Sequence, residues 1–99
     1  MRLLPEQQKT IKKYFLEFFE KGQVYLFGSR ADDNKKGGDI DLYMVVPNLE
    51  NLMQKKIDFL VAVKREIGNQ KIDVVFDRGN NRLIDKIAKK EGVLLWMKS

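Results

Sequence analysis

Two apolar runs separated by a polar, glycine-containing segment constrain what this chain can fold into. The runs are Val24–Phe27 and Leu42–Val46, and both are rich in β-branched and aromatic side chains that favour strands. The segment between them, residues 28–38, contains three glycines and several charged residues, which is typical of a loop. A loop this short predicts two antiparallel neighbouring strands, over residues 23–27 and 39–46.

The second predicted strand begins with two aspartates, Asp39 and Asp41. Residues i and i+2 of a strand point to the same face, so these carboxylates share a face with their Cα atoms roughly 6–7 Å apart. Without a cation between them they would repel each other, and burying them unpaired is costly. Mg²⁺ resolves this conflict because it binds carboxylate oxygens and keeps positions open for phosphates. The pattern therefore predicts metal ligation, with a solvated strand end as the alternative.

These residues carry a resemblance to a known family. Gly28-Ser29, nine intervening residues and then Asp39-x-Asp41 on a strand resemble the nucleotidyltransferases related to DNA polymerase β. The short chain resembles the minimal nucleotidyltransferase (MNT) branch of that superfamily. The likeness runs from about residue 23 to residue 76, and the loop is one residue shorter than the commonest form of the motif.

The resemblance implies a third acid on a later strand, and Asp73 within Lys71–Phe76 fits this position. A carboxylate inside such an apolar run needs compensation, which supports a site. The alternatives are a solvent-facing edge strand or an ion pair between Asp73 and Lys71. By resemblance, Asp39 and Asp41 bind two Mg²⁺ ions, and Asp73 binds the ion nearer the incoming hydroxyl, whose proton it can accept.

The loop after the first strand is expected to bind the triphosphate of ATP. A small residue and a hydroxyl in a turn suit phosphate, which assigns this role to Gly28 and Ser29. Arg30 can meet a phosphate bidentately or brace a neighbouring carboxylate. Many relatives place a basic residue and a glycine where this chain has Asp32 and Asp33, so we expect these two acids to point away from the phosphates.

The size and composition of the chain limit the kinds of protein and of chemistry that it can represent. Ninety-nine residues predict one domain, residues 1–99. The absence of cysteine and histidine excludes disulfides, thiolate sites and imidazole chemistry, leaving carboxylates as metal ligands and bases. No apolar run approaches the ~20 residues of a membrane span, and no signal peptide is evident, so we expect a cytoplasmic protein. The net charge of +5 comes from dispersed lysines, which keep a small protein soluble, and direct nucleic-acid binding is not expected.

Periodicity along the chain predicts an α/β (α+β) fold. The order is α-β-β-α-β-α-β, with helices packed on a small mixed sheet as in the nucleotidyltransferase fold. The expected elements are a helix over 5–21 ended by Gly22, strands 23–27 and 39–46, a helix capped by Asn48 and ended by Gly68, a strand over 71–76 parallel to the second, a helix over 82–91 and a strand over 93–97. The apolar face expected for the second helix comprises Leu49, Leu52, Met53, Ile57, Leu60, Val63 and Ile67.

The resemblance implies a Mg²⁺-dependent nucleotidyltransferase that moves AMP from ATP onto an acceptor hydroxyl. Ninety-nine residues hold a catalytic lobe and little else, so the acceptor is expected on a separate protein. MNT proteins of this kind commonly act beside a HEPN-domain partner, a toxin ribonuclease. The resemblance therefore implies an antitoxin that adenylylates a tyrosine of that partner.

Two other functions stay open at this level. One is a non-catalytic subunit of the same fold that masks its partner, and the short loop with Asp32-Asp33 supports it. The other is a transferase for a small molecule or an RNA end. The lack of room for a second domain argues against this function.

Overall fold

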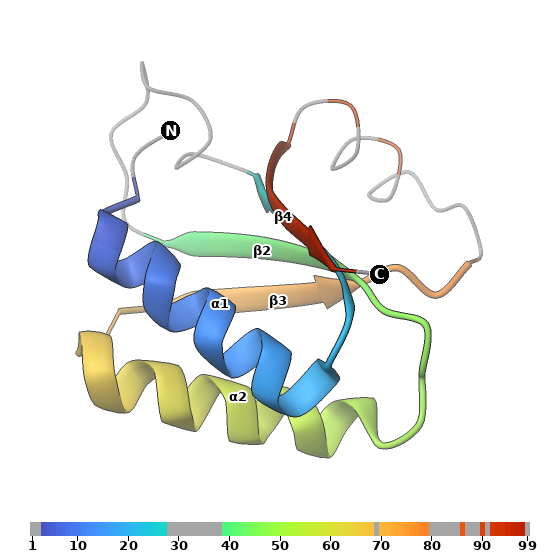
Figure 1. Cartoon of the computed structure of the whole chain (residues 1–99), viewed down its shortest axis with the longest axis horizontal. Coiled ribbons are helices and arrows are strands. Elements are labelled where there is room, and N and C mark those ends of the chain that lie inside the picture. The colour runs from blue at the N-terminus through green and yellow to red at the C-terminus, as the bar shows by residue number, and fades with distance from the viewer. Residues whose placement is uncertain are drawn as a thin grey trace.

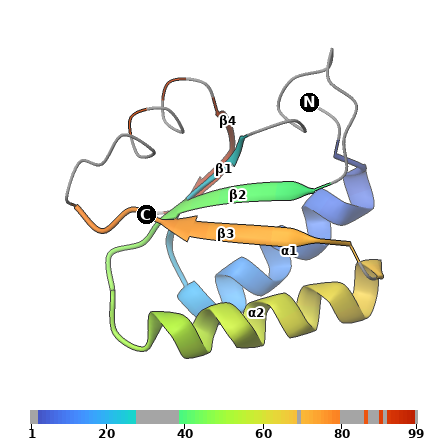
Figure 2. The same ribbon diagram turned by 180° about the vertical axis from the view of Figure 1, so that it is seen from behind.

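The chain forms a four-stranded sheet with two helices on one of its faces (Figures 1 and 2). The computed structural model describes residues 3–27, 39–68, 70–79, 86, 90 and 92–98. Its elements are α1 (Pro5–Phe19), β1 (Gly22–Phe27), β2 (Ile40–Val45), α2 (Leu52–Ile67), β3 (Ile72–Phe76) and β4 (Val93–Lys98). The predicted mixed α/β class is confirmed. The helix predicted over 82–91 lies outside the described residues except at Lys86 and Lys90, which are both helical.

The strands lie in the order β3-β2-β1-β4, and both predicted pairings are confirmed. Strand β1 pairs antiparallel with β2 on one side and with β4 on the other. Strand β2 pairs parallel with β3, because α2 carries the chain back across the sheet between them. Neither helix in the described part is long and apolar enough to cross a membrane.

The core lies between the two helices and one face of the sheet. Alternate strand residues point into it: Val24, Leu26, Ile40, Leu42, Met44, Ile72, Val74 and Phe76 are all buried. Aromatic rings from both helices meet there, with the Phe19 ring centroid 6.0 Å from that of Phe59 and 5.6 Å from that of Phe76. The other residues of each strand therefore point to the opposite face, which neither helix covers.

The junction between α1 and β1 differs from the prediction. Helix α1 ends at Phe19, and Glu20 takes a positive φ of 69° while its N–H donates to the Leu16 carbonyl. Gly22 does not end the helix; it is the first residue of β1, with φ at 138°. A Cβ at this position would lie 2.2 Å from the Val45 carbonyl oxygen, so glycine is needed for close packing of β1 on β2.

The start of α2 also differs from the prediction, whereas its end agrees. The helix begins at Leu52, and Asn48 caps a turn before it by accepting a hydrogen bond from the Glu50 N–H at 2.9 Å. The residue before the helix is Asn51, in the left-handed region. Gly68 follows the last turn, and its N–H donates to the Lys64 carbonyl at 3.0 Å.

The buried face of α2 is rotated relative to the predicted face. Its fully packed side chains are Leu52, Phe59 and Val63, and the sequence pattern missed Phe59. Three predicted members of the apolar face are instead exposed to solvent: Leu49, Met53 and Ile57. An apolar residue need not face the core: Met53 and Ile57 lie on another side of α2, and Leu49 precedes the helix.

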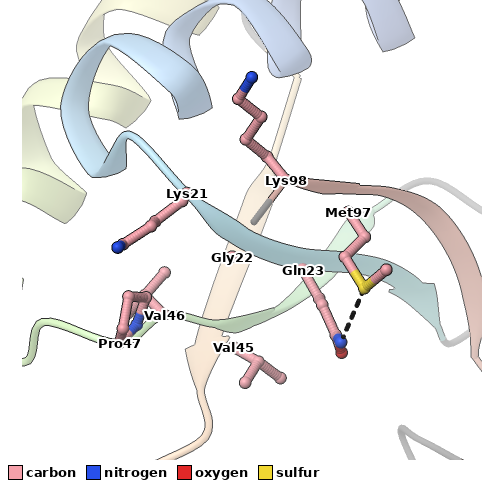
Figure 3. Close-up of a pocket in the computed structure, with 8 residues that line it drawn as sticks. All are labelled: Lys21, Gly22, Gln23, Val45, Val46, Pro47, Met97 and Lys98. Carbon is pink, nitrogen blue, oxygen red and sulfur yellow. Dashed lines mark hydrogen bonds between the residues drawn. The ribbon is translucent and has the colours of Figure 1, made fainter.

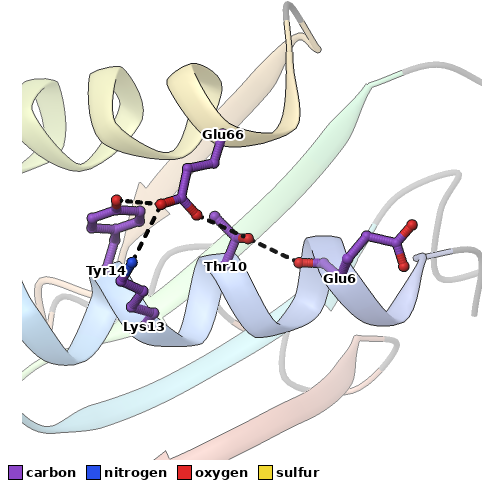
Figure 4. Close-up of polar contacts among 5 residues, drawn as sticks. All are labelled: Glu6, Thr10, Lys13, Tyr14 and Glu66. Carbon is purple, nitrogen blue, oxygen red and sulfur yellow. Dashed lines mark hydrogen bonds and ion pairs between the residues drawn. The ribbon is translucent and has the colours of Figure 1, made fainter.

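A cluster of polar side chains joins α1 to α2 (Figure 4). The Glu66 carboxylate on α2 accepts hydrogen bonds from Tyr14 at 2.7 Å, Lys13 at 3.3 Å and Thr10 at 3.4 Å. Thr10 also donates to the Glu6 carbonyl at 2.9 Å. These contacts set the position of one helix along the other at the solvent-exposed edge of their interface.

Glu66→Gln should lower the melting temperature at pH 7, by a few degrees at most, because the cluster is exposed to solvent. The Tyr14 and Lys13 hydrogen bonds lower the pKa of Glu66. A lowered folded-state pKa stabilises the fold above the unfolded pKa of about 4.3 and loses this effect as the pH falls through the folded value. Thermal unfolding of both proteins between pH 3 and pH 7 tests this, with the exposed Glu17→Gln as control. An equal loss of melting temperature at pH 3 and at pH 7 would contradict this prediction.

Candidate active site at the start of two parallel strands

The pairing of β2 with β3 brings the predicted acids together. Asp41 is the direct partner of Asp73 in this parallel pair, and paired residues on strands about 4.8 Å apart point to the same face. Asp39 lies two residues before Asp41 and therefore shares this face. Their neighbours Ile40 and Leu42 are buried in the core, so the three aspartates belong to the face of the sheet opposite α1 and α2.

The three carboxylates influence one another electrostatically. Burial raises the pKa of Asp41, and the negative charges of Asp73 and then Asp39 raise it further. The positive charge of Lys71 acts in the opposite direction. The acids therefore form one electrostatic cluster in which the charged form of Asp41 is disfavoured.

Lys71 also belongs to this cluster, and its ion-pair partner differs from the one considered in the sequence. Its Nζ lies 3.5 Å from Asp39 Oδ2, whereas the ion pair considered as an alternative in the sequence joined Lys71 to Asp73. The reason is the register: Lys71 precedes Asp73 by two residues, as Asp39 precedes Asp41, so the lysine lies opposite Asp39. Both side chains of the pair are well exposed, so its contribution to stability is small.

The donor set of this cluster fits a divalent cation. Asp39, Asp41 and Asp73 offer only oxygen ligands, and their mutual repulsion is what a cation such as Mg²⁺ would relieve. In the described part of the chain no three carboxylates already converge on one point. Binding a shared ion would therefore draw these side chains closer than they lie here.

The other predicted site residues cannot be placed. Gly28, Ser29 and Arg30 lie outside the described residues, so their assignment to the triphosphate stays a prediction. On the same face of the sheet as the acids, Tyr43 is fully buried, and its ring centroid lies 6.1 Å from that of Tyr25 on β1. This aromatic pair packs that face immediately after Asp41.

A depression of about 410 Å³ lies elsewhere on the molecule (Figure 3). Its lining residues are Lys21, Gly22, Gln23, Val45, Val46, Pro47, Met97 and Lys98. They come from the start of β1, the end of β2 and the end of β4, whereas the acids lie at or just before the beginning of β2 and β3. The depression contains no carboxylate, so the acid cluster is the better candidate for the chemistry.

Comparisons with known proteins identify the family and the fold of the chain. The family model "Polymerase beta, Nucleotidyltransferase" matches residues 9–99. No curated protein matches the chain in sequence.

Solved structures of toxin–antitoxin complexes share the fold at low sequence identity. One is an MntA–HepT toxin–antitoxin, with 18% identity, a TM-score of 0.70, and coverage of 96% of this chain and 74% of that chain. Another is a toxin–antitoxin with AMP-PNP, with 20% identity, a TM-score of 0.73, and coverage of 93% and 74%. A third is a tri-AMPylated Shewanella oneidensis HEPN toxin in complex with its MNT antitoxin, with 20% identity, a TM-score of 0.69, and coverage of 94% and 71%.

The family match extends over nearly the whole chain and includes the strands that carry the three aspartates. The chain belongs to the polymerase beta nucleotidyltransferase family.

Proposed function

We propose that this protein is the antitoxin of a toxin–antitoxin pair, and that it transfers AMP from ATP to a tyrosine hydroxyl of a separate HEPN-type toxin. The observation that carries the proposal is the in-register pair Asp41 and Asp73, with Asp39 on the same face. The similar solved structures support it, because one contains AMP-PNP and another contains a tri-AMPylated HEPN toxin.

The aspartates have distinct roles in this reaction. Asp39 and Asp41 would hold Mg²⁺, which when bound neutralises charge on the phosphates. Asp73, on the neighbouring strand, would accept the proton of the acceptor hydroxyl. The acceptor oxygen forms a bond to the α-phosphorus of ATP as the bond to pyrophosphate breaks, and pyrophosphate leaves with its electron pair. The rate comes from positioning and charge compensation, without a covalent enzyme intermediate.

The triphosphate would lie against the loop between β1 and β2. We assign its contacts to the amides around Gly28, the hydroxyl of Ser29 and the guanidinium of Arg30, since these groups suit phosphate oxygens. This assignment rests on the motif in the sequence. It is consistent with Asp41 and Asp73 lying at the start of their strands, because the loop leads directly into β2.

Incubation with labelled ATP, Mg²⁺ and a HEPN-type toxin of the same organism tests the proposal. The wild type should label the partner, with a mass increase of one or more AMP groups on tyrosine, and Asp39→Ala should not. The matched control is Asp58→Ala, which changes an exposed aspartate on α2 away from the cluster. Neutralisation of the toxin without a label, unchanged in Asp39→Ala, would contradict the proposal and indicate masking alone.

A further inference from the structure

Helix α2 and the turn before it carry a line of exposed aliphatic side chains. We call this line the α2 stripe: it consists of Leu49, Met53, Ile57 and Val61, with exposed fractions of 46%, 63%, 48% and 50%. Within α2, the spacing of four residues places Met53, Ile57 and Val61 one above the other, and Leu49 lies in the turn before the helix. The described part of the chain exposes seven large hydrophobic side chains, and four of them lie in this stripe. Single exposed hydrophobics are ordinary, but a contiguous line of them marks an interaction surface.

The stripe lies on the flank of α2 that faces away from α1. Glu66 makes the contacts to α1, and at about 100° per residue Met53, Ile57 and Val61 point roughly 140–180° away from it. Leu60 is half-buried and packs against the core, so it links the stripe to the core. The apolar surface of α2 therefore extends beyond what the fold itself uses.

The charges beside the stripe indicate what kind of surface it fits. Lys56 and Lys64 lie at its border and are both partly buried, as expected when an aliphatic stem packs and the ammonium stays in water. The chain carries a net charge of +5. Two copies paired through the stripe would bring like charges together, which disfavours self-association. An apolar patch rimmed by acidic side chains complements both the stripe and its lysines.

We propose that the α2 stripe is the docking surface for the HEPN-type toxin, through an apolar patch of that protein rimmed by carboxylates. This inference rests on the proposed function for the identity of the partner. The exposed area of the stripe is on the order of a few hundred Å², in the range where patches are often functional. A stable interface buries about 800 Å² per partner, so the stripe forms the centre of the contact and the lysines its rim.

Docking and chemistry then use different faces of the molecule. The stripe belongs to α2, which covers one face of the sheet, whereas the three aspartates lie on the other face. Substitutions in the stripe should weaken the complex and leave nucleotide binding intact. The acceptor tyrosine therefore reaches the acids either from a segment that extends beyond the docked surface or from another toxin subunit.

Titration calorimetry with the HEPN-type toxin that this protein labels or binds tests the assignment of the stripe. Ile57→Glu should weaken binding by about 30-fold or more, as at the centre of an interface, and Ile57→Leu should bind like the wild type. Leu94→Glu adds the same charge at an equally exposed aliphatic residue of β4, outside α2, and should have little effect. All three variants should keep the melting temperature of the wild type within a few degrees and bind Mg²⁺-ATP equally well.

Three results would overturn the assignment, and each has a distinct meaning. If the wild type labels the toxin and Ile57→Glu still binds it tightly, docking occurs elsewhere and the proposed function stands. If the wild type sediments as a dimer that Ile57→Glu dissociates, the occupant is a second copy. If the wild type neither binds nor labels the toxin, the proposed function fails, and the assignment of the stripe to this partner fails with it.

Discussion

Asp41→Asn should reduce AMP transfer by about 10²–10³-fold or more and at the same time make the fold more stable at neutral pH. The loss of activity follows from removing the carboxylate that is paired with Asp73 and shares a face with Asp39. The gain in stability follows because the folded protein disfavours the charge on this side chain. Burial first, and then the negative charges of Asp73 and Asp39, raise the pKa of Asp41.

The pH dependence of this stability difference has a definite sign. A carboxyl group whose pKa is raised on folding holds its proton more tightly in the folded state, so it destabilises the fold as the pH rises through its titration. Asparagine carries no charge at any pH. The melting temperature of Asp41→Asn should therefore exceed that of the wild type at pH 7, and the difference should shrink as the pH falls below about 4.

Thermal unfolding with and without Mg²⁺ measures the stability of Asp41→Asn and its binding of the metal. Mg²⁺ should raise the melting temperature of the wild type, because a ligand that binds the folded state stabilises it, and should have much less effect on Asp41→Asn. Asp58→Asn is the matched control and should behave like the wild type in every assay. A variant that loses activity and also melts at a lower temperature at pH 7 would show that Asp41 has a structural role instead.

Gly22→Ala should cost about 3 kcal/mol or more of stability, enough to lower the melting temperature by more than about 10 °C. Two effects combine at this position. The φ angle of 138° is one that side chains rarely adopt, and the new Cβ would lie 2.2 Å from the Val45 carbonyl oxygen. That oxygen belongs to the backbone of β2, opposite Gln23 of β1, so it cannot move without disturbing the pairing of the two central strands.

Gly68→Ala separates the two effects in the Gly22 prediction. Gly68 has a φ of 92° but no atom within 4 Å of an added Cβ, so only backbone strain of about 1 kcal/mol should appear. Denaturant unfolding of both variants gives the comparison. Equal destabilisation would show that the contact with Val45 relaxes at no cost.

The placement of the three aspartates side by side could be predicted from the sequence because it follows from strand periodicity, whereas the exposure of Asp73 on the edge strand β3 could not. The spacing of Asp39 and Asp41 places them on one face in any strand, and the helix between β2 and β3 requires the parallel pairing that brings Asp73 beside them. Each of these steps depends on local pattern and on general rules of chain connection.

Other features depend on contacts between distant segments, which a pattern does not reveal. Phe59 is buried because Phe19 lies against it, whereas Met53 and Ile57, equally apolar, point to solvent. The pairing of Lys71 with Asp39 depends on the register between β2 and β3. The sequence pattern predicts that Gly22 ends a helix. Only its contact with the Val45 carbonyl shows that this glycine allows β1 to pack closely on β2.

The parallel crossover between β2 and β3 has a consequence for the order in which the molecule assembles. Asp41 and Asp73 are far apart along the chain and become neighbours only after α2 has docked and β3 has joined the edge of the sheet. Pairing of such distant segments is slow, and an edge strand is held on one side alone. Catalytic competence should therefore appear late in folding and disappear early in unfolding, when β3 frays from the sheet while both helices are still packed.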